Sequence, residues 1–144
     1  MTPQRITLVT LGVTDMARSR AFYAALGWRM HPDSTASMTV YQANGFALGL
    51  FGLADLAKDQ GRPGAALGTG ASTLAQNFET EAEVDAAYAR AQEAGATPLK
   101  APEKVFWGGY SGYFADPDGH VWELAMNPFW PLADDGSLTL PDAS

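Results

Sequence analysis

The chain has 144 residues, of which 47% are apolar and 17% are charged, and its net charge is −7. This balance is typical of one globular domain, or of two small modules that share one core. The nine Lys and Arg residues form no basic stripe, which excludes a nucleic-acid binder and disfavours an anionic membrane surface. The sequence has no cysteine, so we expect no disulfide. It shows no signal peptide and no apolar run of about 18 residues, so we expect a cytoplasmic protein without a membrane span.

The first half predicts a strand, a helix and a hairpin. Residues 6–13 are rich in β-branched side chains and indicate a strand. Asp15 is the expected N-cap of a helix that Gly27 ends. Asn44-Gly45 favours a tight turn between two strands. These hairpin strands are expected at 38–43 and 46–51, with a short helix at about 53–58.

The second half repeats this order. Residues 73–78 indicate a strand, and Thr80 with Glu83 fits a capping box at the start of a helix that Gly95 ends. Asp116-Pro117-Asp118-Gly119 is a turn signal, because Pro117 fixes φ and Gly119 adopts a positive φ without steric cost. The strands of this half are expected at about 97–100, 110–115 and 121–127.

The repeat predicts an α+β chain of two tandem βαβββ modules whose curved half-sheets enclose a shared cleft. A ferredoxin-like or other α+β sandwich with a coincidental repeat is the alternative. In the two-module prediction, residues 1–144 form one domain. Its parts are module one at about 5–58, a glycine-rich linker at about 59–71, module two at about 72–128 and a C-terminal tail at 129–144.

Two segments resemble the vicinal oxygen chelate superfamily of glyoxalases, bleomycin-resistance proteins and dioxygenases. They are LGVTDMARSRAFY at 11–23, followed by LGW at 26–28, and FADPDGHVWEL at 114–124. The resemblance covers roughly residues 5–128 and implies the two-module fold. It leaves the function open, because the superfamily includes both enzymes of several kinds and non-catalytic binding proteins.

Metal-using members of this superfamily place His, Glu or Gln at four strand positions around a divalent ion. In this chain the matching positions hold Leu8, Gly49, Thr73 (within one or two residues) and Glu123. One carboxylate cannot hold a catalytic metal, which needs about three protein ligands. We therefore expect no metal and no cofactor. Relocated ligands such as His120 with Glu123 are disfavoured, because residues three apart on a strand point to opposite faces.

Glu123 is the expected centre of the site and the catalytic residue if the protein is an enzyme. On the alternation of the strands, Leu8, Gly49, Phe51 and Asn127 share the cleft face. Either Gln76 or Asn77 faces the ligand, and the sequence does not decide which. The other candidate ligand-binding residues are Trp107, for stacking on a ring, and Tyr110 and Tyr113.

Two functions are compatible with this site. The first is metal-independent binding of a small organic molecule, aromatic or cationic, in an apolar cleft with one carboxylate. The second is a metal-free lyase or isomerase of glyoxalase type with Glu123 as general base; it lacks an identified oxyanion stabiliser. Whether the protein is an enzyme stays open, although a metal-dependent glyoxalase or dioxygenase is disfavoured. The resemblance also implies a homodimer.

Overall fold

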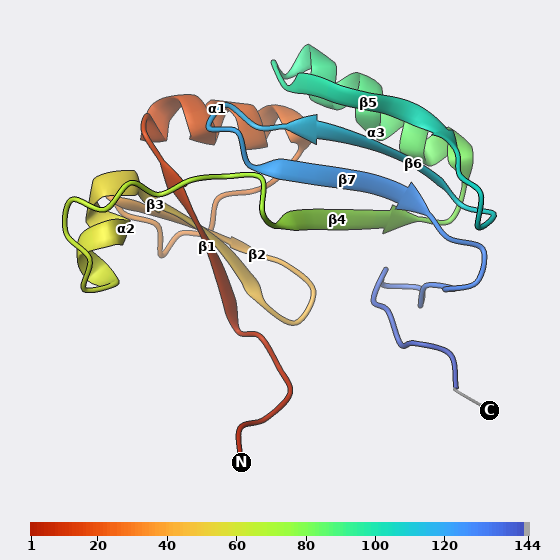
Figure 1. Cartoon of the computed structure of the whole chain (residues 1–144), viewed down its shortest axis with the longest axis horizontal. Coiled ribbons are helices and arrows are strands. Elements are labelled where there is room, and N and C mark those ends of the chain that lie inside the picture. The colour runs from red at the N-terminus through yellow and green to blue at the C-terminus, as the bar shows by residue number, and fades with distance from the viewer. Residues whose placement is uncertain (143–144) are drawn as a thin grey trace. The chain divides into compact units, whose positions relative to one another are not determined.

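The computed structural model describes residues 1–142, and the chain divides into two compact units, residues 1–68 and the part from Thr69 onward. Each unit has one sheet with its own helices (Figure 1). The elements of the first unit are β1 (Leu8–Val13), α1 (Met16–Leu26), β2 (Met38–Gln42), β3 (Ala47–Gly52) and α2 (Leu53–Asp59). Those of the second are β4 (Thr73–Phe78), α3 (Glu81–Glu93), β5 (Thr97–Lys104), β6 (Tyr110–Ala115) and β7 (Val121–Met126). The α+β class and the two-module organisation predicted from the sequence are confirmed.

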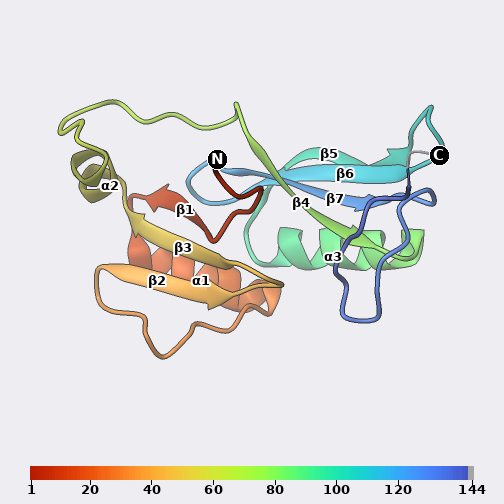
Figure 2. The same cartoon turned by 90° about the horizontal axis from the view of Figure 1, so that it is seen from below.

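The sheet of the first unit has the strand order β1-β3-β2, with β1 parallel to β3 and β2 antiparallel to it. Helix α1 begins at its predicted N-cap, where the Asp15 carboxylate accepts a hydrogen bond from Arg18 N at 3.1 Å, and Gly27 ends it with φ 102°. Figure 2 shows α1 lying along this sheet. The helix packs Phe22 and Tyr23 into a core with Tyr41, Leu48 and Leu50.

Two details of the first unit differ from the sequence prediction. Strand β1 begins at Leu8 and not at Ile6, which lies outside the sheet and is 69% exposed. Helix α2 follows β3 directly, so this unit is βαββα rather than βαβββ among the residues that the structure describes. The predicted hairpin is present, with Ala43 N donating to Phe46 O at 2.9 Å and Gly45 at φ 78°.

The sheet of the second unit has the order β4-β7-β6-β5, with β4 parallel to β7 and the other pairs antiparallel. Helix α3 begins at the predicted N-cap, where Glu83 N donates to Thr80 Oγ1 at 3.1 Å and Thr80 Oγ1 donates to the Glu83 carboxylate at 3.0 Å. The helix lies along one face of the sheet in both views (Figures 1 and 2). Its buried side chains, Val84, Tyr88 and Ala91, contribute to the core of this unit.

The turn between β6 and β7 has the chemistry that its sequence predicted. Gly119 has φ 92°, and its N–H donates to Asp116 O at 3.0 Å. The Asp116 carboxylate is buried and accepts hydrogen bonds from Asp118 N and His120 N, both at 2.9 Å. This rigid turn fixes the register in which β7 returns beside β6, and therefore the position of Glu123.

Candidate functional site

The second sheet has two chemically different faces. Phe114 and Trp122 are paired in register, buried, and stacked with ring centroids 6.4 Å apart. They share the α3 face with Leu124. Because side chains alternate along a strand, Tyr113 and Glu123 point to the opposite face, where both are partly buried. We call this opposite side the Glu123 face.

Four side chains form a row across the Glu123 face. Ala75 on β4 pairs with Glu123 on β7, Glu123 pairs with Tyr113 on β6, and Tyr113 pairs with Lys100 on β5. Tyr113 is the register partner of Glu123, so the phenol lies beside the carboxylate. Burial raises the pKa of Tyr113, the neighbouring Glu123 carboxylate raises it further, and Lys100 opposes the shift. Tyr113 is therefore a neutral donor between a carboxylate and an ammonium group.

An irregular register in β5 brings the carboxylate of Glu103 to the Glu123 face, beside Lys100. Lys100 pairs with Tyr113 and Glu103 with Ser111, so three steps along β5 match two steps along β6. The extra residue reverses the alternation, and Lys100 and Glu103 point the same way. Their side chains form an ion pair, with Lys100 Nζ 3.0 Å from Glu103 Oε1. Neither residue was a candidate from the sequence, because the bulge in β5 has no local sequence signal.

The register of β4 decides between Gln76 and Asn77. Asn77 pairs with Ala125 and so shares the Glu123 face, whereas Gln76 pairs with Leu124 on the α3 face. The position directly opposite Glu123 is Ala75 rather than Thr73, which pairs with Val121. Asn77 therefore lies two residues along β4 from Ala75, the register partner of Glu123, and belongs to the Glu123 face.

Tyr110 is not part of the Glu123 face. It lies at the start of β6 on the α3 side, where its hydroxyl donates to Asp85 Oδ1 on α3 at 2.7 Å. This hydrogen bond, followed by desolvation and by the charges of Asp85 and Glu81, raises the pKa of Tyr110 to about 12. Its role in the structure is to join α3 to the sheet, so the structure does not bring it together with Glu123.

Trp107 and Asn127 lie in connections next to the sheet. The Trp107 indole covers the Gly109 backbone so closely that a Cβ at residue 109 would lie 2.0 Å from the ring. The indole remains 39% exposed. Asn127 follows β7, and its Oδ1 accepts a hydrogen bond from Phe129 N at 2.9 Å, which stabilises the turn after the strand. Both side chains are engaged in local structure.

The remaining candidates, Leu8, Gly49 and Phe51, share one face of the first sheet. Gly49 pairs with Thr10 on β1, two residues from Leu8. A Cβ at residue 49 would lie 3.1 Å from Met38 Cε and 3.4 Å from Leu8 Cδ1. Leu8 is 45% exposed. Apolar side chains predominate on this face, which also carries Thr10 on β1 and Gln42 on β2.

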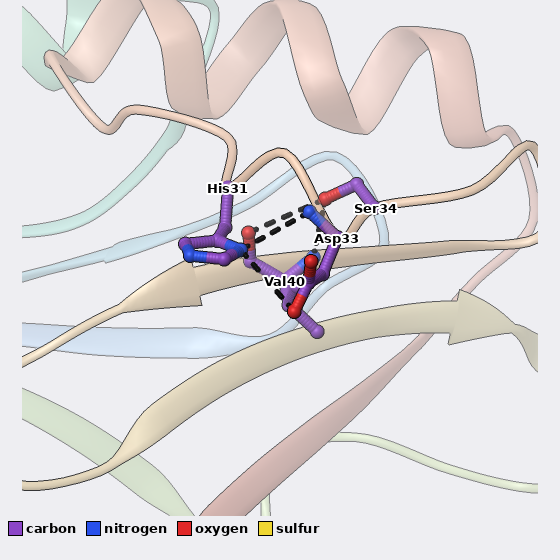
Figure 3. Close-up of polar contacts among 4 residues, drawn as sticks. All are labelled: His31, Asp33, Ser34 and Val40. Carbon is purple, nitrogen blue, oxygen red and sulfur yellow. Dashed lines mark hydrogen bonds and ion pairs between the residues drawn. The ribbon is translucent and has the colours of Figure 1, made fainter.

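The histidines have structural partners. His31 lies in the loop before β2, where its Nδ1 accepts a hydrogen bond from Asp33 N at 3.1 Å and lies 3.8 Å from Asp33 Oδ2 (Figure 3). His31 N donates to Val40 O at 2.8 Å, which attaches the loop to β2. His120 N and O both bond to Asp116 in the turn before β7.

The donor set does not fit the divalent ion that the resemblance implies. Of the four strand positions, those occupied by Leu8, Gly49 and Ala75 offer no ligand atom on the side chain, and Glu123 alone offers oxygen. Throughout residues 1–142, no group of three or more His, Asp or Glu side chains is arranged to hold a metal ion.

The chain belongs to the glyoxalase/bleomycin resistance protein/dioxygenase superfamily, whose family model matches residues 5–124. A crystal structure of a glyoxalase-related enzyme from Fulvimarina pelagi is 36% identical, with a TM-score of 0.88, and the match covers 97% of this chain and 100% of that one. A lactoylglutathione lyase from Agrobacterium tumefaciens has a TM-score of 0.68 over 92% of this chain and 100% of its own. At 24% identity, this second likeness shows the shared fold alone.

Curated relatives match only a segment. An uncharacterized protein of Mycobacterium bovis is 47% identical over 47 residues, which are 33% of this chain and 31% of the relative. An uncharacterized protein of Mycobacterium tuberculosis is also 47% identical over 47 residues, which are 28% of that relative. The matched region thus spans less than a third of either relative.

Each helix in the described part of the chain is too short or too polar to cross a membrane.

Proposed function

We propose that this protein binds a small organic molecule with a cationic or hydrogen-bond-donating group, without a metal ion, and that Glu123 is the anionic contact. The observation that carries the proposal is the environment of Glu123. Its neighbour on β4 is Ala75, its neighbour on β6 is the neutral Tyr113, and the side chains near it on β7 are small or aliphatic. A partly buried carboxylate without a cationic partner on either neighbouring strand is a contact that a cationic ligand can supply.

Benzylamine is a suitable first probe, because it combines an ammonium group with one aromatic ring. Calorimetric titration should show binding to the wild-type protein, and Glu123→Gln should weaken it about tenfold or more, since a charge-assisted contact is lost. Glu93→Gln is the matched control, because this exposed residue at the end of α3 undergoes the same change in charge. Equal losses in the two variants, or no binding to wild type, would reject the proposal.

A second candidate function is metal-free proton abstraction next to a carbonyl group, with Glu123 as general base. One observation favours it: Tyr113, whose hydroxyl stays protonated, is the register partner of Glu123 and can donate to a developing enolate oxygen beside the carboxylate. The sequence had named Tyr113 without placing it. This activity would belong to the same surface, so both functions depend on Glu123.

Proton exchange tests this second function directly. In D₂O with excess chelator, the wild-type protein should exchange the proton next to the carbonyl of an α-hydroxyketone, measured by loss of its NMR signal. Glu123→Gln should abolish the exchange, and Tyr113→Phe should slow it. Exchange that persists in Glu123→Gln, or that is lost with the chelator alone, would contradict a role for the carboxylate as a metal-free base.

A further inference from the structure

We propose that Lys100 and Tyr113 form an anion-accepting subsite beside Glu123, so that the Glu123 face binds a small zwitterion. The cationic end of the ligand contacts Glu123, and its carboxylate contacts Lys100. This inference specifies the ligand class for the proposed function and rests on it for the role of Glu123. It adds a second pole, on β5, that the sequence did not indicate.

The geometry of the sheet sets the spacing of the two poles. Glu123 on β7 and Lys100 on β5 are separated by one strand, and each pairs with Tyr113 on β6. Neighbouring strands lie about 4.8 Å apart, so the two backbones are separated by roughly 10 Å. All three side chains point to the same face. A ligand with charges several ångströms apart, such as a para-substituted ring, matches this span.

The charges do not cancel across the row. Lys100 Nζ lies 3.0 Å from Glu103 Oε1, whereas the register partner of Glu123 on β6 is the neutral Tyr113. The strand that carries Tyr113 separates Lys100 from Glu123, so Lys100 is paired with Glu103 and not with Glu123. Glu123 therefore has no cation on a neighbouring strand, and Lys100 becomes available to a ligand carboxylate that replaces Glu103.

Glu103 is a partner that a ligand carboxylate can replace. The Lys100 and Glu103 side chains are 46% and 59% exposed, and an ion pair this exposed is screened by water and adds little to stability. Exchange of one carboxylate for another at Lys100 therefore costs little. Tyr113 is the register partner of Lys100 on the same face, so its side chain gives the incoming group a polar neighbour.

Three probes with the same ring separate the two poles. 4-(Aminomethyl)benzoate has both charges, benzylamine has only the cation, and 4-methylbenzoate has only the anion. In calorimetric titrations at low salt, we expect wild type to bind 4-(aminomethyl)benzoate about tenfold more tightly than benzylamine, because a charge-assisted contact to Lys100 is added. 4-Methylbenzoate should bind most weakly, since Glu123 repels it.

Two substitutions move this preference in opposite directions. Lys100→Met keeps an unbranched apolar stem and should erase the advantage of the zwitterion while benzylamine still binds. Glu103→Gln removes the competing carboxylate and should enlarge the advantage. Lys104→Met is the matched control, because Lys104 lies on the same strand but reaches α3, with its Nζ 3.9 Å from Glu81 Oε2. It should leave the preference unchanged.

The outcomes separate this inference from the proposed function. If benzylamine binding depends on Glu123 but the zwitterion gains nothing, or keeps its gain in Lys100→Met, the subsite is wrong and the proposed function stands. If none of the three probes binds wild type, both are wrong. Thermal unfolding monitored by circular dichroism checks that each variant is folded. The larger advantage of the zwitterion expected for Glu103→Gln tests the subsite even if Lys100→Met is unstable.

Discussion

Two tyrosines on β6 show how one strand serves both structure and site. Tyr110 and Tyr113 lie three residues apart and therefore point to opposite faces of the sheet. Tyr110 donates to Asp85 on the helix side, and Tyr113 lies beside Glu123 on the other side. Each phenol has a carboxylate close by and a lysine as its register partner on β5, Lys104 for Tyr110 and Lys100 for Tyr113.

Tyr110 gives a pH-dependent prediction. Its pKa in the folded protein is about 12, above the ordinary value of 10.0, mainly because its proton is held in the bond to Asp85. The stability from this bond is complete below pH 10 and is lost as the pH rises from about 10 to 12, since the unfolded state deprotonates first. Tyrosinate absorbance, as a difference between wild type and Tyr110→Phe, should show this late titration.

Asp85→Asn is the variant that tests the cause of this shift. It removes the negative charge next to the phenol, so Tyr110 should titrate closer to its ordinary pKa of 10.0. Glu93→Gln, on the same helix but at its other end, should leave the titration where it is in wild type. A Tyr110 titration that stays near 12 in Asp85→Asn would contradict the assignment of the shift to this pair.

At the scale of elements, the bulge in β5 depends on a glycine in the neighbouring strand. A Cβ at residue 112 would lie 2.8 Å from Pro102 N and 2.9 Å from Lys100 O, both backbone atoms that cannot rotate away. Gly112→Ala should therefore push β5 from β6 and lower the free energy of unfolding by about 1–3 kcal/mol, as overpacking does. Urea unfolding measures this loss.

Gly68→Ala is the control for Gly112→Ala. No atom lies within 4 Å of a Cβ at residue 68, so this substitution should be neutral or slightly stabilising. Since Lys100 flanks the bulge, Gly112→Ala should also reduce the preference for 4-(aminomethyl)benzoate over benzylamine. Equal unfolding midpoints for the two variants would show that β5 does not need the close approach at residue 112.

The sequence predicted those elements whose signals are local. The caps at Asp15 and Thr80 and the turns at Gly45 and Gly119 were correct, because each depends on the chemistry of a few adjacent residues. Strand β5 was predicted to end at Lys100 but continues through Pro102 to Lys104. An edge strand tolerates proline, since one of its sides has no hydrogen-bonding partner, and edge position is a property of the whole sheet.

The candidate site was predictable to the same extent. Glu123 was identified from strand alternation, and Tyr113 was named as a candidate without a position; the two are register partners in the structure. Lys100 was missed because the register of β5 shifts on both sides of it, and Tyr110 was named without a position because its helix partner, Asp85, is distant in sequence. Side-chain direction follows from the sequence only where strand register is regular.

At the scale of the whole molecule, the two units are variations on one order of elements. In each, the first strand lies parallel beside the last, and a helix following the first strand covers one face. Each unit also has its own buried core, with Leu48 and Leu50 in the first and Phe114 and Leu124 in the second. Helix α2 takes the place of a fourth strand in the first unit, so the repeat is incomplete there.

The segment between α2 and β4 should therefore be the first site of proteolysis. Residues 60–72 contain no helix or strand, most of them are exposed, and Gly64 and Gly70 have φ of 78° and 98°. Elastase should cut after Ala65 or Ala66, leaving β1–α2 and β4–β7 on separate fragments, before any cut inside a helix or strand. Mass spectrometry over a time course identifies the first products. Replacing both alanines by Asp removes the preferred site and should delay this cut, whereas a first cut at residues 31–37 in wild type would show that the first unit opens more readily than the connection.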